Sequence, residues 1–246
     1  MLPIPRADWA WFLDMDGTLI EIVPNPDDVT VPPGLVPILN RLRDGSGGAL
    51  AVVSGRRVET IRHLLAPLDP VCAGLHGLEL HIPGENPDLP PQTLDTTRAM
   101  LAVLREFAET HPGTFVEDKG LTVGLHYRTA PHHQDAARQA AEKACALASG
   151  YQILAGKMVY EIRPDGHDKG TAVETLMRRP PFAGRIPVFI GDDVTDEDGF
   201  AVVRRMGGIT IRVGSPGERP TKAEYHIESV AALRRWLAEA ADKLAG

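Results

Sequence analysis

The sequence has few cysteines, few aromatic residues and no long hydrophobic run. Only Cys72 and Cys145 occur among its 246 residues, which excludes a disulfide framework of the kind that supports small secreted proteins. No apolar stretch reaches the ~18 residues that a membrane-spanning helix requires, and the apolar run near the first residues is too short for a secretory signal. We therefore expect a protein of the reducing cytoplasm that has no contact with a membrane.

Positive charge is scarce as well. The chain has 26 Lys and Arg residues against 33 Asp and Glu residues, a formal net charge of -7, and no basic run. This balance lacks the electrostatic footprint of a nucleic-acid-binding protein. With 43% hydrophobic residues the chain can bury a large core, so we expect a globular monomer with a small-molecule partner.

Short apolar runs alternate with stretches of helical periodicity. The runs are continuously apolar, which is typical of strands buried on both faces in a parallel sheet. The intervening stretches place apolar residues on one helical face. The expected strands are residues 9–14, 48–54, 70–75, 186–191 and 208–214, and the expected helices are residues 57–68, 169–179, 195–206 and 229–245. This pattern predicts an α/β fold with a parallel sheet.

The middle of the chain has a different order of elements. After the Pro-rich stretch 82–92, the patterns indicate a helix, two strands, a second helix and two further strands. Because this stretch interrupts the parallel-sheet pattern, we predict a smaller αβ domain, residues 83–165, inserted into a core domain formed by residues 1–82 and 166–246.

Two aspartates follow the first expected strand, in the sequence FLDMDGTLIEIV at residues 12–23. Carboxylates this close repel each other and lose hydration, so such a pair normally holds a cation or performs chemistry. Asp14, at the strand end, is the candidate nucleophile, and Asp16 is the candidate general acid and base. Asp192 follows a later expected strand, and ligands of open α/β sheets bind beyond the carboxyl ends of the strands. We therefore predict that Asp14, Asp16 and Asp192 bind Mg²⁺.

Two further segments are expected at the same edge of the sheet. Ser54 and Lys169 are expected at helix N-termini, where backbone N–H groups favour a phosphate, and Lys169 adds a positive charge. We predict catalytic roles for both, and substrate contacts for Gly55 and Arg56. Taken singly, Ser54 could be a helix cap and Lys169 a solvated lysine. Their occurrence with the aspartates favours a site, whereas Arg56 stays open as a site residue or a surface residue.

Acidic residues also crowd an expected helix start in GDDVTDED, residues 191–198. Thr195 followed by Asp198 resembles a capping box, and acids suit the first turn of a helix. For residues 196–198 the sequence leaves a capping role and a site role equally open, while Asp192 is assigned to the site.

At these residues the chain resembles the haloacid dehalogenase superfamily of aspartate-nucleophile phosphatases. The motifs DMDGT, VVSGRR, the lysine of DKGTAV and GDDVTDED occur in the order of that superfamily. The resemblance implies a Rossmann-like core domain with an inserted αβ cap domain, Mg²⁺ as a cofactor and an aspartyl-phosphate intermediate.

Within that superfamily the chain is similar to trehalose-6-phosphate phosphatases, in the segments SGRR, GLHGLE, GDDVTDEDGF, VEDKGLTVGLHYR and MVYEIRP. In that family the cap domain recognises the disaccharide. The matching positions here are Glu117, Lys119, Arg128 and Glu161, which are candidate substrate-binding residues. The implied activity is hydrolysis of trehalose 6-phosphate, a small phosphosugar.

Strand alternation in the insert is compatible with that role. Val123 and Leu125 share one face of their expected strand, and Tyr160 and Ile162 share one face of another. These apolar faces must pack on the two insert helices, which leaves an open face that carries acids and bases. A sugar-binding face and an ordinary solvated face both fit this pattern, and Phe115 interrupts it.

Other functions also fit the sequence. The same core residues could serve sucrose 6-phosphate or another phosphosugar, because only the cap specifies the sugar. A phospho-accepting signalling module also phosphorylates an aspartate beside Mg²⁺ ligands, but Asp16 would hydrolyse the phosphoryl group that such a module must keep. A catalytically inactive binding module is disfavoured because no motif residue is missing.

Overall fold

The computed structural model describes residues 2–23, 28–85, 94–156, 158–217 and 219–245. The chain forms two compact units, which we call the core unit (Met1–Leu89 with Asp168–Gly246) and the insert unit (Pro90–His167). The domain boundaries expected at 82/83 and 165/166 stay a prediction. The Pro-rich stretch at 82–92 lies mostly outside the described residues.

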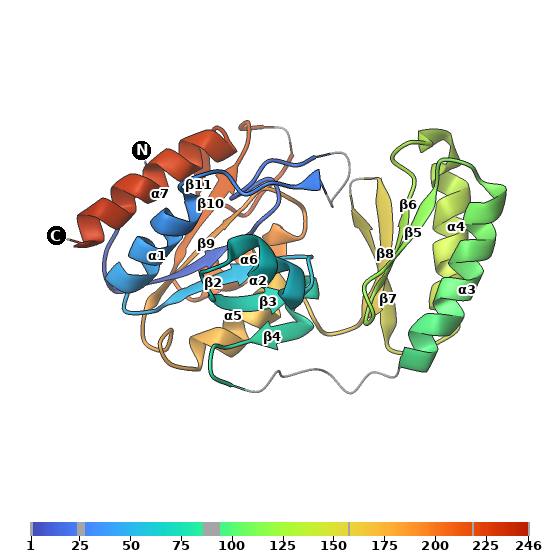
Figure 1. Cartoon of the computed structure of the whole chain (residues 1–246), viewed down its shortest axis with the longest axis horizontal. Coiled ribbons are helices and arrows are strands. Elements are labelled where there is room, and N and C mark those ends of the chain that lie inside the picture. Colours follow the sequence, from blue (N-terminus) through green and yellow to red (C-terminus); the bar gives the residue numbers. More distant parts are fainter. Residues whose placement is uncertain (1, 24–27, 86–93, 157, 218, 246) are drawn as a thin grey trace. The chain divides into compact units, whose positions relative to one another are not determined.

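A seven-stranded sheet forms the centre of the core unit (Figure 1), with the strand order β11-β10-β9-β1-β2-β3-β4. All neighbouring strands pair in parallel except β3 and β4, which are antiparallel. The strands are β1 (Trp9–Leu13), β2 (Leu50–Val53), β3 (Val71–Gly74), β4 (Glu79–His81), β9 (Ile186–Gly191), β10 (Ile209–Val213) and β11 (Tyr225–Ile227). The predicted α/β class and parallel sheet are confirmed.

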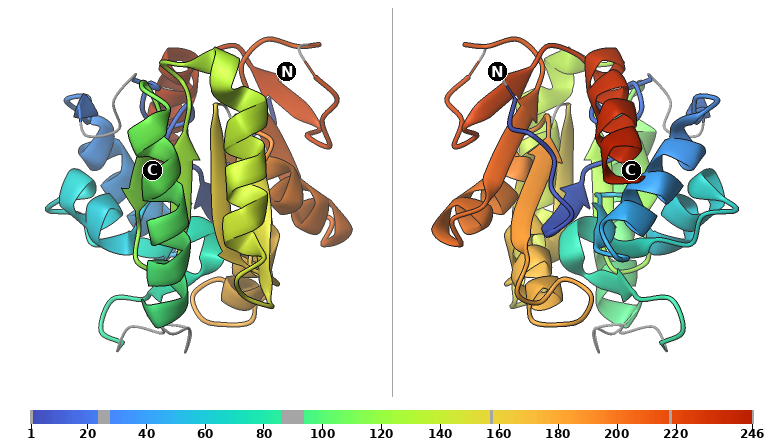
Figure 2. Two further views of the ribbon diagram at one scale, coloured as in Figure 1. Left: turned by 90° about the vertical axis from the view of Figure 1, so that its right-hand side faces the viewer. Right: turned by 90° about the vertical axis from the view of Figure 1, so that its left-hand side faces the viewer.

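Helices cover both faces of this sheet. The first face carries α1 (Leu35–Gly45), α2 (Val58–Leu65) and α7 (Val230–Ala245), and the second carries α5 (Lys169–Met177) and α6 (Asp196–Arg205). Figure 2 shows α1 and α7 side by side. Strand β1 explains the arrangement, because Trp9, Trp11 and Leu13 pack with the first group while Ala10 and Phe12 pack with the second. A continuously apolar strand is therefore what a doubly covered sheet requires.

The insert unit consists of a four-stranded antiparallel sheet and two helices, with the strand order β5-β6-β8-β7. Its main elements are α3 (Leu94–Thr110), β5 (Phe115–Asp118), β6 (Val123–His126), α4 (Gln134–Cys145), β7 (Tyr151–Gly156) and β8 (Val159–Pro164). This is the predicted order of helix, two strands, helix, two strands. Short 3-10 helices lie at Leu75–Gly77 in the core unit and at Pro131–His133 in the insert unit.

One face of the insert sheet packs on its helices. Figure 2 shows α3 and α4 side by side on that face, where Val123, Leu125, Tyr160 and Ile162 join their apolar residues in one cluster. The opposite face, which we call the open face, carries no helix of the insert unit among the described residues. The predicted alternation therefore holds, and Phe115 interrupts it because it lies 46% exposed with its ring stacked on His126, at a centroid distance of 4.3 Å.

No helix among the described residues is long and apolar enough to cross a membrane.

Candidate active site

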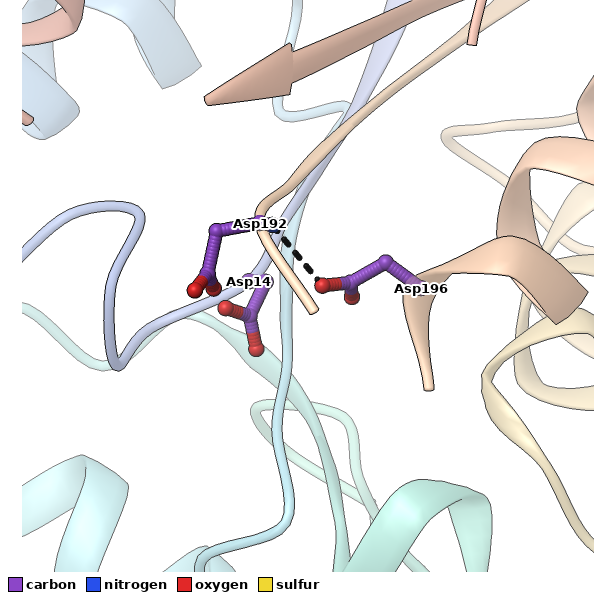
Figure 3. Close-up of side chains that lie close together, drawn as sticks. All are labelled: Asp14, Asp192 and Asp196. Atoms are coloured by element: carbon purple, nitrogen blue, oxygen red, sulfur yellow. Dashed lines mark hydrogen bonds between the residues drawn. The ribbon is translucent and has the colours of Figure 1, made fainter. Parts of the chain in front are cut away.

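Three carboxylates gather at the carboxyl ends of two neighbouring strands in the core unit. Asp14 directly follows β1, and Asp192 directly follows β9, its parallel neighbour. Asp196 is the first residue of α6. Each of the three offers a carboxylate oxygen within 4.8 Å of the others, and Figure 3 shows their side chains drawn together. The sequence prediction that Asp14 and Asp192 converge on this edge agrees with the geometry.

Lys169 is the cation within this group. Its Nζ donates hydrogen bonds to Oδ1 of Asp14 at 2.7 Å and to Oδ1 of Asp196 at 2.6 Å, and the residue is 3% exposed. Lys169 begins α5, and the Asp168 side chain caps that helix in a capping box with Thr171. The cap fixes the backbone from which the lysine extends, and hydrogen bonds of this length between charged groups are strong.

Asp196 uses both of its oxygens. While Oδ1 accepts from Lys169, Oδ2 accepts the backbone N–H groups of Asp192 and Asp193 at 2.9 and 2.8 Å. A Cβ atom at residue 191 would overlap the Asp196 side chain, which explains the glycine there. Asp196 therefore holds the turn after β9 in place and orients Lys169.

The capping box, one of the two roles that the sequence left open at the start of α6, does not form. Thr195 is the N-cap residue, but its side chain makes no cap hydrogen bond, because its backbone already has helical angles, φ -66° and ψ -19°. Asp196, for which the sequence left both roles open, is fully buried and belongs to the site. The sequence held one signal for this role. Gly191, which precedes Asp192 and Asp193, leaves room for the side chain of Asp196 to point into the site.

Negative charge exceeds positive charge in this cluster. Burial, followed by the charge of Asp196, raises the pKa of Asp14 well above its ordinary value. Burial and Asp196 likewise raise the pKa of Asp192 to about 7. Burial disfavours the charged form of Lys169, but the two carboxylates outweigh it and raise its pKa. Three hard oxygen donors around one lysine suit an additional divalent cation of the Mg²⁺ type.

Gly17 shapes the turn that follows β1 and that packs against Asp192. Its φ is +83°, in the region that favours glycine, and a Cβ atom would overlap the Asp192 carboxylate. The next residue, Thr18, donates from its hydroxyl to Oδ1 of Asp192 at 3.3 Å. The turn after β1 thus packs directly on Asp192, the acid that follows β9.

Asp16 lies outside the three-carboxylate group. Its two oxygens accept hydrogen bonds from Nε and the terminal nitrogen of Arg56, both at 2.7 Å. This bidentate pair joins the two motifs at the ends of β1 and β2. The pair places Arg56, which the sequence left open, in the site. The prediction that the Asp16 side chain binds Mg²⁺ receives no support from this geometry and stays a prediction.

Ser54 is buried but does not lie at a helix N-terminus, so that expectation is wrong. It directly follows β2, whereas α2 begins four residues later at Val58 with Arg57 as its N-cap. Its Oγ accepts the backbone N–H of Arg56 at 3.2 Å, and its carbonyl accepts the N–H of His76 at 2.9 Å. The contact with the His76 turn requires a loop here, and a Cβ atom at Gly55 would meet the His76 ring at 2.7 Å.

Arg219 is a site residue that the sequence analysis missed. Its guanidinium donates to Oδ1 of Asp193 at 3.0 Å and to the backbone carbonyl of Asp192. Burial opposes the shift, but the hydrogen bond from the backbone of Val194, followed by the hydrogen bond from Arg219, holds the pKa of Asp193 below its usual range. Arg219 follows β10 in a loop, so no local pattern connects it with the aspartates.

The predicted substrate-binding residues of the insert unit form a separate polar cluster on the open face. Nζ of Lys119 donates to Oε2 of Glu161 at 3.0 Å and lies 3.6 Å from Oε2 of Glu117. Nε2 of His126 lies 2.8 Å from the same Glu117 oxygen. Although burial opposes both shifts, these contacts lower the pKa of Glu117 and raise that of Lys119. Arg128, half-buried and two residues beyond β6, is not joined to the cluster by these contacts.

Comparisons with known proteins identify the family. The trehalose-phosphatase family model matches residues 12–231. The trehalose-6-phosphate phosphatase of Escherichia coli is 38% identical over 96% of this chain and 87% of its own length. A probable trehalose-phosphate phosphatase of Sinorhizobium fredii is 43% identical over 92% and 85%. The C-terminal domain of Candida albicans trehalose-6-phosphate phosphatase shares the fold, with a TM-score of 0.79 and 23% identity over 97% of this chain and 92% of that one.

The expected fold of the haloacid dehalogenase superfamily is therefore confirmed. The match of the family model over most of the chain agrees with two relatives that are similar along nearly their whole length. The chain belongs to the trehalose-phosphatase family, whose members are phosphoric monoester hydrolases.

Proposed function

We propose that this protein hydrolyses trehalose 6-phosphate to trehalose and phosphate, through a phosphorylated aspartate and with Mg²⁺ as its cofactor. The observation that carries the proposal is the buried contact of Lys169 with Asp14 and Asp196 beside Asp192. That arrangement fits phosphoryl transfer to a strand-end carboxylate, and the family relatives point to the sugar.

In the first step a carboxylate oxygen of Asp14 attacks phosphorus, and the bond between phosphorus and the sugar oxygen breaks. Asp16 gives its proton to the departing sugar oxygen, which leaves as a hydroxyl group. In the second step a water molecule attacks the phosphoryl group while Asp16 takes a proton from it. The bond between Asp14 and phosphorus then breaks, so phosphate is released and both aspartates return to their starting states.

Other core residues orient these two. Lys169 holds Asp14 by a hydrogen bond and supplies positive charge to the phosphoryl oxygens. Arg56 holds Asp16, and its guanidinium can also donate to a phosphate. Asp14 and Asp192 would hold Mg²⁺, which supplies charge neutralisation for the phosphoryl group when bound. The raised pKa values of both carboxylates support a need for such a cation.

The open face of the insert unit is the proposed sugar-binding surface. Glu117, Lys119 and Glu161 provide hydrogen-bond acceptors and donors within one connected cluster, and Arg128 is the further residue that the family resemblance assigns. A mixture of acids and bases with partly enclosed stems suits the hydroxyl groups of a sugar.

The decisive experiment is a comparison of phosphate release from trehalose 6-phosphate, sucrose 6-phosphate and glucose 6-phosphate with the purified protein. We expect the highest kcat/KM for trehalose 6-phosphate. A preference for sucrose 6-phosphate or glucose 6-phosphate would assign the protein to another phosphosugar. No release from any of them, with a stable phosphoryl group on Asp14, would indicate a phospho-accepting module instead.

A further inference from the structure

Arg163 is a buried arginine for which the described residues provide no hydrogen-bond acceptor. The residue is 5% exposed on β8, and its Nε is enclosed without a hydrogen-bond partner. No hydrogen bond or ion pair to its guanidinium is found in the part of the chain that the structure describes. Burying the guanidinium of an arginine costs free energy unless a hydrogen-bond acceptor binds it. By contrast, Lys169 is similarly buried and donates hydrogen bonds to two carboxylates.

Thr122 shows a second enclosed polar atom of the same kind. The residue is 0% exposed, and its Oγ1 has no hydrogen-bond partner among the described residues. It precedes Val123 by one residue, and Arg163 follows Ile162 by one residue, while Val123 and Ile162 pair across β6 and β8. The register therefore places the two unsatisfied side chains next to each other.

Both side chains lie on the side of the insert sheet opposite to α3 and α4, the open face, although both are buried there. Arg163 follows Glu161 by two residues on β8, so the two side chains point to the same side of the sheet. Val123 and Ile162 point to the helices, so their neighbours Thr122 and Arg163 point away from them. The unsatisfied pair thus extends the cluster of Glu117, Lys119 and Glu161 along β6 and β8.

We propose that Arg163 and Thr122 are further substrate-binding residues, which form hydrogen bonds with hydroxyl oxygens of the sugar part of the phosphosugar. A guanidinium presents donors in a planar fork that can reach two neighbouring hydroxyl oxygens, and a threonine hydroxyl both donates and accepts. The ligand is a sugar rather than a phosphate, because the acids Glu117 and Glu161 already balance the positive charges of Lys119 and Arg163, which leaves no excess of positive charge for an anion. This inference rests on the proposed function, since it extends the same sugar-binding face.

The experiment compares three variants with the wild-type protein. Arg163→Met keeps an unbranched apolar stem, shorter than that of arginine, and removes the donors. Thr122→Val keeps the shape and removes the hydroxyl. Arg138→Met is the matched control, because Arg138 is an exposed arginine of the same unit that pairs with Glu142 on α4. For each protein we would measure kcat/KM for trehalose 6-phosphate and 4-nitrophenyl phosphate, the inhibition constant of trehalose, and Tm.

Arg163→Met should lower kcat/KM for trehalose 6-phosphate by ~10- to 100-fold and weaken trehalose inhibition by about tenfold, the cost of lost hydrogen bonds to a bound ligand. Thr122→Val should lower the same kcat/KM by about tenfold. Its Tm should stay the same or rise, since an apolar isostere removes an unsatisfied buried hydroxyl. Hydrolysis of 4-nitrophenyl phosphate and all values for Arg138→Met should stay within about twofold of wild type.

Unchanged sugar-phosphate kinetics in both folded variants would overturn the proposal, and so would equal losses on both substrates. If Arg163→Met fails to fold, Thr122→Val decides alone. The proposed function fails separately, when the wild-type protein does not hydrolyse trehalose 6-phosphate. The variants are then measured with whichever phosphosugar the wild type hydrolyses, and a selective loss on that sugar still supports the role of the pair.

Discussion

Each unit of this protein contains a lysine held between two carboxylates. In the core unit Lys169 contacts Asp14 and Asp196 at 2.7 and 2.6 Å and is almost fully enclosed. In the insert unit Lys119 lies 3.0 Å from Glu161 and 3.6 Å from Glu117, with its side chain 16% exposed. The two clusters have the same charges. The contacts of the core cluster are shorter, its lysine is more deeply buried, and Asp196 also binds backbone N–H groups.

Under the proposed function, the difference reflects what each cluster binds, a phosphoryl group in the core unit and a sugar in the insert unit. A phosphoryl group is the same in every phosphate ester, so its site can be rigid and built at the ends of adjacent parallel strands. A sugar differs between substrates, and residues that project from the face of an antiparallel sheet can change without disturbing the strand pairing. The core cluster should therefore control turnover of every substrate, and the insert cluster should control the choice among them.

Asp14→Asn is expected to have the largest effect. Loss of the nucleophile should reduce kcat by at least ~10⁴ for both trehalose 6-phosphate and 4-nitrophenyl phosphate, because both substrates need the same covalent step. When the reaction is quenched with acid during turnover, the wild-type protein should carry a covalently bound phosphoryl group and the variant should carry none. Near-normal turnover by the variant, once deamidation has been excluded by mass spectrometry, would contradict the covalent mechanism.

Removal of divalent cations should be nearly as damaging. Asp14, Asp192 and Asp196 would repel a phosphate dianion without a neutralising cation, so exhaustive chelation should lower activity by ~10³ or more on either substrate. Addition of Mg²⁺ should restore it. Full turnover in the presence of the chelator would show that the carboxylates serve without a metal.

The two lysines allow the clusters to be compared directly. Lys169→Met should reduce kcat/KM by ~10²- to 10³-fold on both substrates, because it removes a positive charge from the phosphoryl site. Lys119→Met is the counterpart in the insert unit and should affect trehalose 6-phosphate by about tenfold and 4-nitrophenyl phosphate hardly at all. Circular dichroism of both variants provides the folding control. An equal loss of kcat/KM on both substrates in Lys119→Met would contradict the assignment of sugar selection to the insert cluster.

Glu161→Ala sharpens the same comparison at smaller scale. If Glu161 accepts a hydrogen bond from a sugar hydroxyl, kcat/KM for trehalose 6-phosphate should fall by ~10², while 4-nitrophenyl phosphate, which lacks a sugar, should be hydrolysed as before. The measurement is the ratio of the two kcat/KM values. A parallel decrease on both substrates would indicate that Glu161 supports the insert fold through Lys119, and no decrease would identify the open face as solvated surface.

The features that the sequence predicted depend on local patterns. Continuous apolar runs identified the strands, and the rule that ligands bind at the carboxyl ends of parallel strands was enough to bring Asp14, Asp192 and Lys169 together. Helix α1 was not predicted, because Pro37 and the prolines before it obscure its start. A proline in the first helical turn loses no hydrogen bond, so the helix forms nevertheless. The edge strands β4 and β11 have only three residues each, too few for a periodic signal.

The features that were missed depend on tertiary contacts. Asp196 looks like any acid at a helix start until the missing Cβ of Gly191 allows it to turn inward. Arg219 reaches Asp193 from a loop 26 residues further along the chain. Thr122 and Arg163 each look ordinary in sequence, and only the strand register makes them neighbours. In each case the deciding information is which backbone segments lie side by side.

The insert unit ends at His167, and the next residue, Asp168, caps the helix that begins with Lys169. The position of the lysine is therefore set by a short motif that lies entirely after the junction. For protein engineering this makes the 167/168 junction a natural recombination point. A chimera that receives a foreign insert there would keep the capping motif and Lys169 of this chain. Under the proposed function, libraries of exchanged inserts would then test new sugar phosphates on an unchanged core unit.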